Sequence, residues 1–171
     1  MKYIKKLASG ANLFFLLLFI FLVFIKYPEF KKNSDQQGSR IQERYEFVDL
    51  ITNEKFAFPS FRRQVVVFWA TWCAPCKVEL ARINNLIEIK KLRPDQVVAV
   101  SLDQNRSDIE ATLKSATYRF LVGHDLNGKV GQAFEVVSTP TILFVDENNV
   151  VYWRTSGISP SLEARILSFF N

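Results

Sequence analysis

The longest run of apolar side chains lies near the N-terminus of the chain. Residues 7–25, LASGANLFFLLLFIFLVFI, carry no charge, and Asn12 is their only strongly polar side chain. A helix of this length covers a hydrocarbon core of about 30 Å. We therefore expect residues 1–25 to form an N-terminal membrane anchor with one transmembrane helix.

A cleavable secretory signal is the alternative interpretation of this run. Such a signal ends in small residues, whereas this one ends in FLVFIKYPEF, with bulky side chains at the cleavage positions. No cysteine directly follows the run to carry a lipoprotein-type anchor. The uncleaved anchor is therefore favoured, and under either interpretation the rest of the chain is exported. Residues 26–43 are polar, with a proline and a glycine, which is typical of a linker.

Shorter patterns in residues 44–171 predict a folded domain. QVVVFWA (64–70) and QVVAVSL (96–102) are apolar nearly throughout, which is typical of strands buried on both faces. TILFVDENNVVYWRT (141–155) predicts an antiparallel hairpin around a polar turn. The other predicted elements are short strands at 45–50, 55–58 and 120–125, and helices at 75–91, 108–115, 127–134 and 159–170.

Two of these helix starts have capping signals. Ser107 and Glu110 have the spacing of a capping box, and Ser159 followed by Pro160 is typical of an N-cap and first helical position. The order of strands and helices predicts an α/β fold, with a mixed sheet flanked by helices.

Composition limits the class of protein. A chain of 171 residues is long enough for one domain with a real core. The net charge of +5 and the pI near 9.3 suggest nucleic-acid binding. However, residues 1–40 hold seven Lys and Arg against two acidic residues, so they account for the whole excess. The predicted domain is balanced in charge, which argues against a nucleic-acid partner.

The chain has two cysteines, Cys73 and Cys76, and they lie in the motif FWATWCAPCKVEL. A structural zinc site needs a full tetrahedral set of ligands, and beyond this pair the chain offers only His124 and carboxylates. We therefore expect no metal. A purely structural disulfide is also a weak explanation, because so short a loop removes little entropy from the unfolded chain. Redox chemistry is the favoured interpretation, with the cysteine pair itself as the redox group and no other cofactor.

The position of the pair predicts a role for each cysteine. A buried strand ends near Ala70 and a helix begins near Pro75, so Cys73 falls at the helix N-cap. Unpaired N–H groups and the positive end of the helix dipole lower the pKa of a thiol there, which makes Cys73 the expected nucleophile. Cys76 lies in the first turn, where it can resolve a mixed disulfide at Cys73.

Glu79 falls within the apolar arc of this helix, which Cys76, Leu80, Ile83 and Ile87 define at 100° per residue. Two interpretations stay open at this point. Glu79 is either a partly exposed acid whose stem packs on the core, or a desolvated carboxyl with a raised pKa that exchanges protons with the cysteines.

The motif FWATWCAPCKVEL, followed by STPT at 138–141, resembles the thioredoxin-like thiol-disulfide oxidoreductases, specifically the membrane-anchored TlpA/ResA/DsbE group. The resemblance covers residues 45–171. It implies a thioredoxin-like fold with an insertion after the second βα unit, at Asp103 to Phe134. Thioredoxins usually carry a buried Asp where this chain has Val67, and the group commonly has Pro where this chain has Ala81. The resemblance favours the catalytic interpretation of Glu79.

The resemblance also implies a substrate site. It predicts a cis peptide bond before Pro140, close to the cysteines, with Thr139 offering backbone groups to an extended substrate segment. The alternative for Pro140 is an ordinary turn proline. Trp72, next to the nucleophile, is expected to be partly exposed and to contact substrate, whereas Trp69 is expected to be structural.

The expected function is that of a thiol-disulfide oxidoreductase acting on exported proteins as a reductant. By resemblance, the substrates include apocytochrome c and the electron donor is a membrane protein of the CcdA/DsbD type. The expected location is the bacterial cytoplasmic membrane, with a single span and the domain on the periplasmic side. The alternatives are a general disulfide oxidant or isomerase, and a peroxiredoxin-like peroxide reductase, although TWCAPC lacks the Thr-x-x-Cys spacing of the latter.

Overall fold

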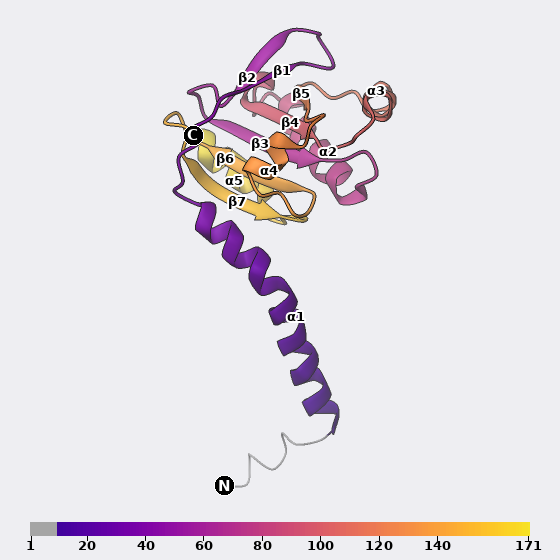
Figure 1. Cartoon of the computed structure of the whole chain (residues 1–171), viewed down its shortest axis with the longest axis vertical. Coiled ribbons are helices and arrows are strands. Elements are labelled where there is room, and N and C mark those ends of the chain that lie inside the picture. Colours follow the sequence, from indigo (N-terminus) through magenta and orange to yellow (C-terminus); the bar gives the residue numbers. More distant parts are fainter. Residues whose placement is uncertain (1–9) are drawn as a thin grey trace. The chain divides into compact units, whose positions relative to one another are not determined.

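The computed structural model of the chain describes residues 10–171 and divides them into two compact units (Figure 1). The first unit extends to Asp35, and its described residues all lie in helix α1 (Gly10–Gln36). The second unit extends from Gln36 to Asn171 and contains all the strands. Each unit is described by itself.

Helix α1 exposes its apolar side chains from Leu13 to Ile25. None of the helices within residues 10–171 has the length and apolar character needed to cross a membrane. The apolar run from which the anchor was predicted begins at Leu7, so the first residues of this run lie outside the described part of the chain.

Part of the linker expected at residues 26–43 is helical. Helix α1 continues through Pro28 to Gln36 and is followed by Gly38, whose φ of +83° favours glycine at a helix end. Beyond it, Gly38 N donates to Val151 O and Ile41 N to Asn149 O, both at 2.8 Å. Residues 38–41 therefore belong to the second unit, because their backbone hydrogen bonds are made there.

A five-stranded sheet forms the centre of the second unit, in the order β5-β4-β3-β6-β7 (Figure 1). Strands β3, β4 and β5 are parallel, and β6 and β7 form the predicted antiparallel hairpin. This confirms the mixed sheet, and the QVVVFWA segment supplies its central strand. The strands are β3 (Gln64–Trp69), β4 (Val97–Ser101), β5 (Leu121–His124), β6 (Thr141–Val145) and β7 (Val151–Ser156).

The other elements flank this sheet. Strands β1 (Tyr45–Val48) and β2 (Lys55–Phe58) form a separate antiparallel pair. The helices are α2 (Ala74–Glu88), α3 (Arg106–Ser115), α4 (Lys129–Ala133) and α5 (Leu162–Phe170), with a short 3-10 turn η2 at Pro94–Gln96. Helices α3 and α4 and strand β5 all lie within the expected insertion.

Side chains of β3 alternate between two cores. Val65, Val67 and Trp69 pack with α2, α3 and α5, in the cluster that also holds both cysteines. Val66 and Phe68 pack on the opposite face, against residues of β1, β2 and α4. Since both faces of β3 are covered, every residue of this strand is buried, as its apolar run predicted.

Two predicted helix caps are wrong. The N-cap of α3 is Asn105, not Ser107, so this helix begins earlier than its capping-box signal suggested. Helix α5 begins at Leu162 with Ser161 as N-cap, later than the expected Ser159. Before this helix, residues 159–162 form a turn in which Leu162 N donates to Ser159 O at 3.1 Å, and the backbone of Ser159 also binds Glu79 and Arg82.

Candidate active site

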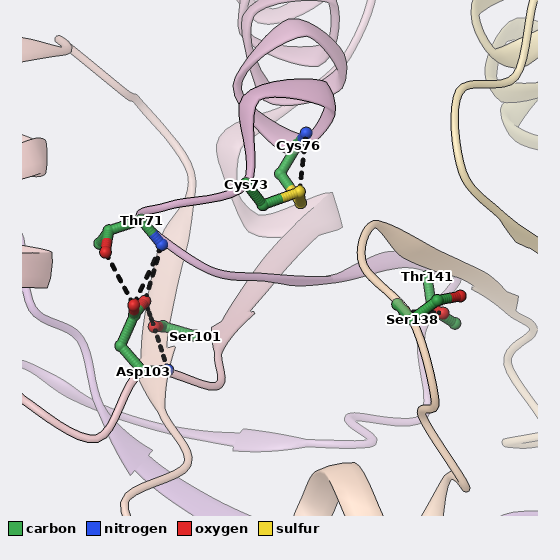
Figure 2. Close-up of a disulfide and its surroundings, with 7 residues drawn as sticks. All are labelled: Thr71, Cys73, Cys76, Ser101, Asp103, Ser138 and Thr141. Atoms are coloured by element: carbon green, nitrogen blue, oxygen red, sulfur yellow. Dashed lines mark hydrogen bonds between the residues drawn. A yellow bond between two sulfur atoms is a disulfide. The ribbon is translucent and has the colours of Figure 1, made fainter.

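Cys73 and Cys76 form a disulfide at the start of α2, with 2.05 Å between the sulfurs and 5.3 Å between the Cα atoms (Figure 2). Cys73 is the N-cap residue, which confirms the position expected from the sequence. Its sulfur accepts a hydrogen bond from the backbone N–H of Cys76 at 3.1 Å. An N–H group of the first helical turn is thus already directed at the sulfur that would carry negative charge on reduction.

The residues around the disulfide differ in exposure. Cys73 is 4% exposed, whereas Cys76 is fully buried. Trp72, directly before Cys73, is 77% exposed, in agreement with its expected position at the surface of the site. Trp69 is fully buried in the core beside the cysteines. Both cysteines are thus buried, and Cys73 is the one with residual exposure.

The Thr139–Pro140 peptide bond is cis, as predicted, and Pro140 is buried at the start of β6. Strand β6 pairs with β3 in a register that sets Thr141 opposite Phe68. Continued by one residue, this register brings Pro140 opposite Trp69, at the end of the sheet from which the chain leads to Cys73. The segment is braced by Thr141 Oγ1, which donates to Ser138 O at 2.8 Å, and by Gly157 N, which donates to Pro140 O at 2.7 Å.

Glu79 is fully buried one turn after Cys76, so the interpretation of this residue as a partly exposed acid is wrong. Its Oε1 accepts from Ser159 N at 2.6 Å, and its Oε2 accepts from Arg82 Nη1 at 2.8 Å. Arg82 also donates to Ser159 O at 2.9 Å and to Glu163 Oε1 at 3.1 Å. The carboxylate thus joins α2 to the loop before α5, a structural role that the helical wheel did not reveal.

Asp103 is a site residue that the sequence reasoning missed. Its carboxylate, 7% exposed, accepts hydrogen bonds from Thr71 and Ser101, and Thr71 lies two residues before Cys73 (Figure 2). His124, which nothing in the sequence placed near the cysteine motif, donates from Nε2 to the Asp103 carbonyl at 2.7 Å. The sequence showed that Asp103 follows a buried strand; that this strand lies parallel to β3, so that both end at the same edge of the sheet, comes from the structure.

Residues 55–166 match the sequence pattern of the Redoxin family, which covers most of the chain. The chain belongs to this family. A relative, the thiol-disulfide oxidoreductase ResA of Oceanobacillus iheyensis, is 34% identical over 84 residues, which are 49% of this chain and 44% of the relative. The sporulation thiol-disulfide oxidoreductase A of Bacillus subtilis is 24% identical over 105 residues, 59% of this chain and 64% of that one.

A solved structure shows a similar fold. StoA from Bacillus subtilis has a TM-score of 0.67 at 19% identity, and the match covers 78% of this chain and 100% of that one. The expected thioredoxin-like fold is therefore confirmed. The chain spans about half the length of the curated relatives it matches.

Proposed function

We propose that this Redoxin-family chain is a thiol-disulfide oxidoreductase. The observation that carries the proposal is the Cys73–Cys76 disulfide at the first turn of α2, with the Cys76 N–H directed at the Cys73 sulfur. A sulfur in this position is stabilised as a thiolate, the reactive form in thiol-disulfide exchange. The names of the ResA and sporulation relatives support the same chemistry.

The reaction is a pair of sulfur exchanges. The Cys73 thiolate attacks one sulfur of a substrate disulfide, forms a mixed disulfide and releases the other substrate sulfur as a thiolate. The Cys76 thiolate then attacks the Cys73 sulfur, re-forms the Cys73–Cys76 bond and releases the second substrate thiolate. Two electrons pass from the cysteine pair to the substrate, so the pair itself is the only redox group that the reaction needs.

Glu79 is proposed to handle the proton of Cys76. It lies one turn further along α2, on the same side of the helix. Each oxygen of its carboxylate accepts one hydrogen bond and retains a further acceptor position. The carboxylate can therefore receive the Cys76 proton while its contacts to Arg82 and Ser159 hold it in place.

Thr139, Pro140 and Trp72 are proposed to contact the substrate. Trp72 offers an exposed ring beside Cys73. The first residue of β6 pairs with β3 near the end of β3 that leads to Cys73. An extended polypeptide segment that carries the target disulfide would lie between them. We propose exported proteins as substrates, apocytochrome c among them, and a membrane protein of the CcdA/DsbD type as electron donor.

The location is proposed to be the extracytoplasmic side of the bacterial cytoplasmic membrane. The support is the apolar run 7–25 and the exposed apolar side chains from Leu13 to Ile25. If this segment anchors the chain, the full-length protein sediments with membranes, and a chain that begins at residue 37 stays in the supernatant. Recovery of the full-length protein in the supernatant would contradict the anchor.

The direction of electron flow is tested by equilibrating the protein with a dithiothreitol or glutathione couple and measuring the fraction of oxidised Cys73–Cys76. A reductant should have a potential near that of thioredoxin, about −270 mV. A value near that of a strong oxidant, about −120 mV, would instead assign the protein to disulfide formation.

The exchange reaction is tested by substituting the resolving cysteine. A Cys76→Ser variant should accumulate stable mixed disulfides with its substrates, because no second thiol releases them, and Cys73→Ser should form none. Mixed disulfides that still form on the Cys73→Ser variant would contradict the assignment of Cys73 as nucleophile.

A further inference from the structure

Three hydroxyl and amide groups converge on the carboxylate of Asp103, just beyond the end of β4 (Figure 2). Thr71 N lies 3.1 Å from Oδ1 and 2.9 Å from Oδ2, and Thr71 Oγ1 donates to Oδ1 at 2.7 Å. Ser101 Oγ donates to Oδ2 at 2.7 Å. A buried carboxylate with this set of donors is held in one orientation, because each oxygen accepts from a different hydroxyl group.

Two of the donors, Thr71 N and Thr71 Oγ1, belong to the turn that leads to Cys73. Strand β3 ends at Trp69, and the turn after it is closed by Cys73 N, which donates to Ala70 O at 3.1 Å. Thr71 lies inside this turn, so both its backbone and its side chain are fixed by Asp103. The hydrogen bonds between Thr71 and the Asp103 carboxylate thus join the turn at residues 70–73 to the segment that follows β4.

Hydrogen bonds to the backbone around Asp103 hold this residue in place. Leu102 N donates to Trp69 O at 2.9 Å, which continues the pairing of β4 with β3 past the strand end. His124 Nε2 donates to the Asp103 carbonyl, and Asp125 N donates to Ser101 O at 2.9 Å. The ends of three parallel strands thus hold Asp103, and Asp103 holds the turn before the disulfide.

We propose that Asp103 is a positioning residue for the Cys73 sulfur, acting through Thr71. Cys73 keeps the extended backbone of an N-cap, with φ −84° and ψ 97°, and this backbone directs its sulfur to the Cys76 N–H. If the turn loses its tie to β4, the sulfur spends less time on the N–H group that stabilises the thiolate. The inference rests on the proposed exchange function, and it adds residues outside the cysteine motif to the machinery of that reaction.

The test compares Asp103→Asn and Thr71→Val with the wild type, using the full reduced chain in detergent. The pH dependence of Cys73 alkylation by iodoacetamide reports thiolate formation, and the exchange rate with 5,5′-dithiobis(2-nitrobenzoic acid) reports reactivity. We expect Thr71→Val, which keeps the carboxylate charge, to move the alkylation midpoint to higher pH. Asp103→Asn should move it further, by about one pH unit, with an exchange rate about tenfold lower at neutral pH.

Asp49 provides a matched control elsewhere in the same domain. It is 1% exposed, and like Asp103 it accepts from a threonine N–H and hydroxyl, those of Thr52, at 3.0 and 2.7 Å, and from Val122 N at 2.8 Å. Asp49→Asn and Thr52→Val should lower the free energy of unfolding as their counterparts do. Their alkylation midpoints and exchange rates should stay at the wild-type values.

The outcomes separate the two proposals. If the wild type exchanges and the variants at 71 and 103 lose stability only, Asp103 is a structural residue and the inference fails alone. A shift of the Asp103→Asn midpoint to lower pH would show that the carboxylate acts through its charge, and would also overturn a positioning role. If Asp103→Asn does not fold, Thr71→Val decides by the same two measurements. A wild type without exchange activity would instead remove the proposed function.

Discussion

At the scale of single residues, the environment decides what a side chain contributes. Glu79 and Asp103 are both buried carboxylates near the cysteine motif, and each accepts hydrogen bonds from one nearby residue and one distant residue. Arg82 supplies a charge to the first, whereas the second is held by a threonine, a serine and a backbone N–H. The first joins helix α2 to the loop before α5, and the second joins the cysteine turn to β4.

Glu79→Gln is expected to lower the free energy of unfolding by about 1–3 kcal/mol, because an amide has a single acceptor oxygen for the two donors, Arg82 and Ser159. Urea unfolding measures the loss. The double variant Glu79→Gln/Arg82→Gln should lose less than the sum of the single variants, since the two groups interact directly.

Glu163→Gln is the control for this prediction. Glu163 contacts the same arginine but is 45% exposed on its side chain, so its loss should cost under about 1 kcal/mol. A Glu79→Gln variant as stable as the wild type would show that the buried contacts contribute nothing. It would leave proton handling as the only role for the carboxylate, to be read from the pH profile of exchange.

Tyrosines give the fold a dependence on alkaline pH. Burial, followed by the hydrogen bond to Glu43, raises the pKa of Tyr45 to about 12, and burial raises the pKa of Tyr118. A folded pKa above the unfolded value near 10 means that the stability is complete below pH 10 and is lost as the pH rises through the folded values. Phenolate absorbance should therefore titrate at higher pH in the folded chain than in urea, and Tyr45→Phe should remove part of that difference. Coincident titrations would contradict this.

At the scale of elements, close packing between strands limits which residues are allowed. Gly123 in β5 lies against Phe47 of β1, and a Cβ added there would be 2.6 Å from Phe47 Cδ1. The Phe47 ring is stacked on Phe56 at 5.4 Å, so it has little freedom to move away. The absence of a side chain at 123 therefore lets the β1–β2 pair rest on the edge of the main sheet.

Gly123→Ala is expected to destabilise the second unit by about 1–3 kcal/mol through this overpacking. Thermal or urea unfolding measures the effect. Phe47→Leu/Gly123→Ala should recover part of the loss, because the smaller side chain makes room for the added methyl group. Equal stability of Gly123→Ala and the wild type would mean that β1 shifts without cost.

At the scale of the whole molecule, the boundary between the units is set by backbone pairing. Residues 38–41 make hydrogen bonds with 149–151, including the bridge between Arg40 and Val150. The second unit therefore includes the segment from Gly38 onward, although its composition resembles that of a linker. Helix α1 ends just before it.

A chain that begins at residue 37 is expected to fold and to keep its exchange activity, because the second unit has its own core. A chain that begins at residue 44 should be less stable by about 1–3 kcal/mol, since Val151 and Asn149 lose their partners. Unfolding curves of the two chains provide the comparison. Equal stability would show that the 38–41 pairing contributes nothing.

The sequence by itself determined most of the elements and the place of the cysteine pair in the fold. The apolar runs of β3 and β4 and the hairpin at 141–155 are local patterns, and so is the position of Cys73 between a buried strand and a helix. The cis bond before Pro140 came from family resemblance, because a local pattern does not distinguish it from a turn proline.

Only the tertiary structure decided which distant groups meet. Ser159 was expected to cap a helix, and it instead binds Glu79, 80 positions away in the chain. Asp103 meets Thr71 across 32 positions, and residues 38–41 meet 149–151. These contacts depend on the order and register of the strands. Order and register are in turn set by which apolar side chains pack together in the core. A single sequence carries no local signal for that choice, whereas periodicity within one segment is enough to predict the segment itself.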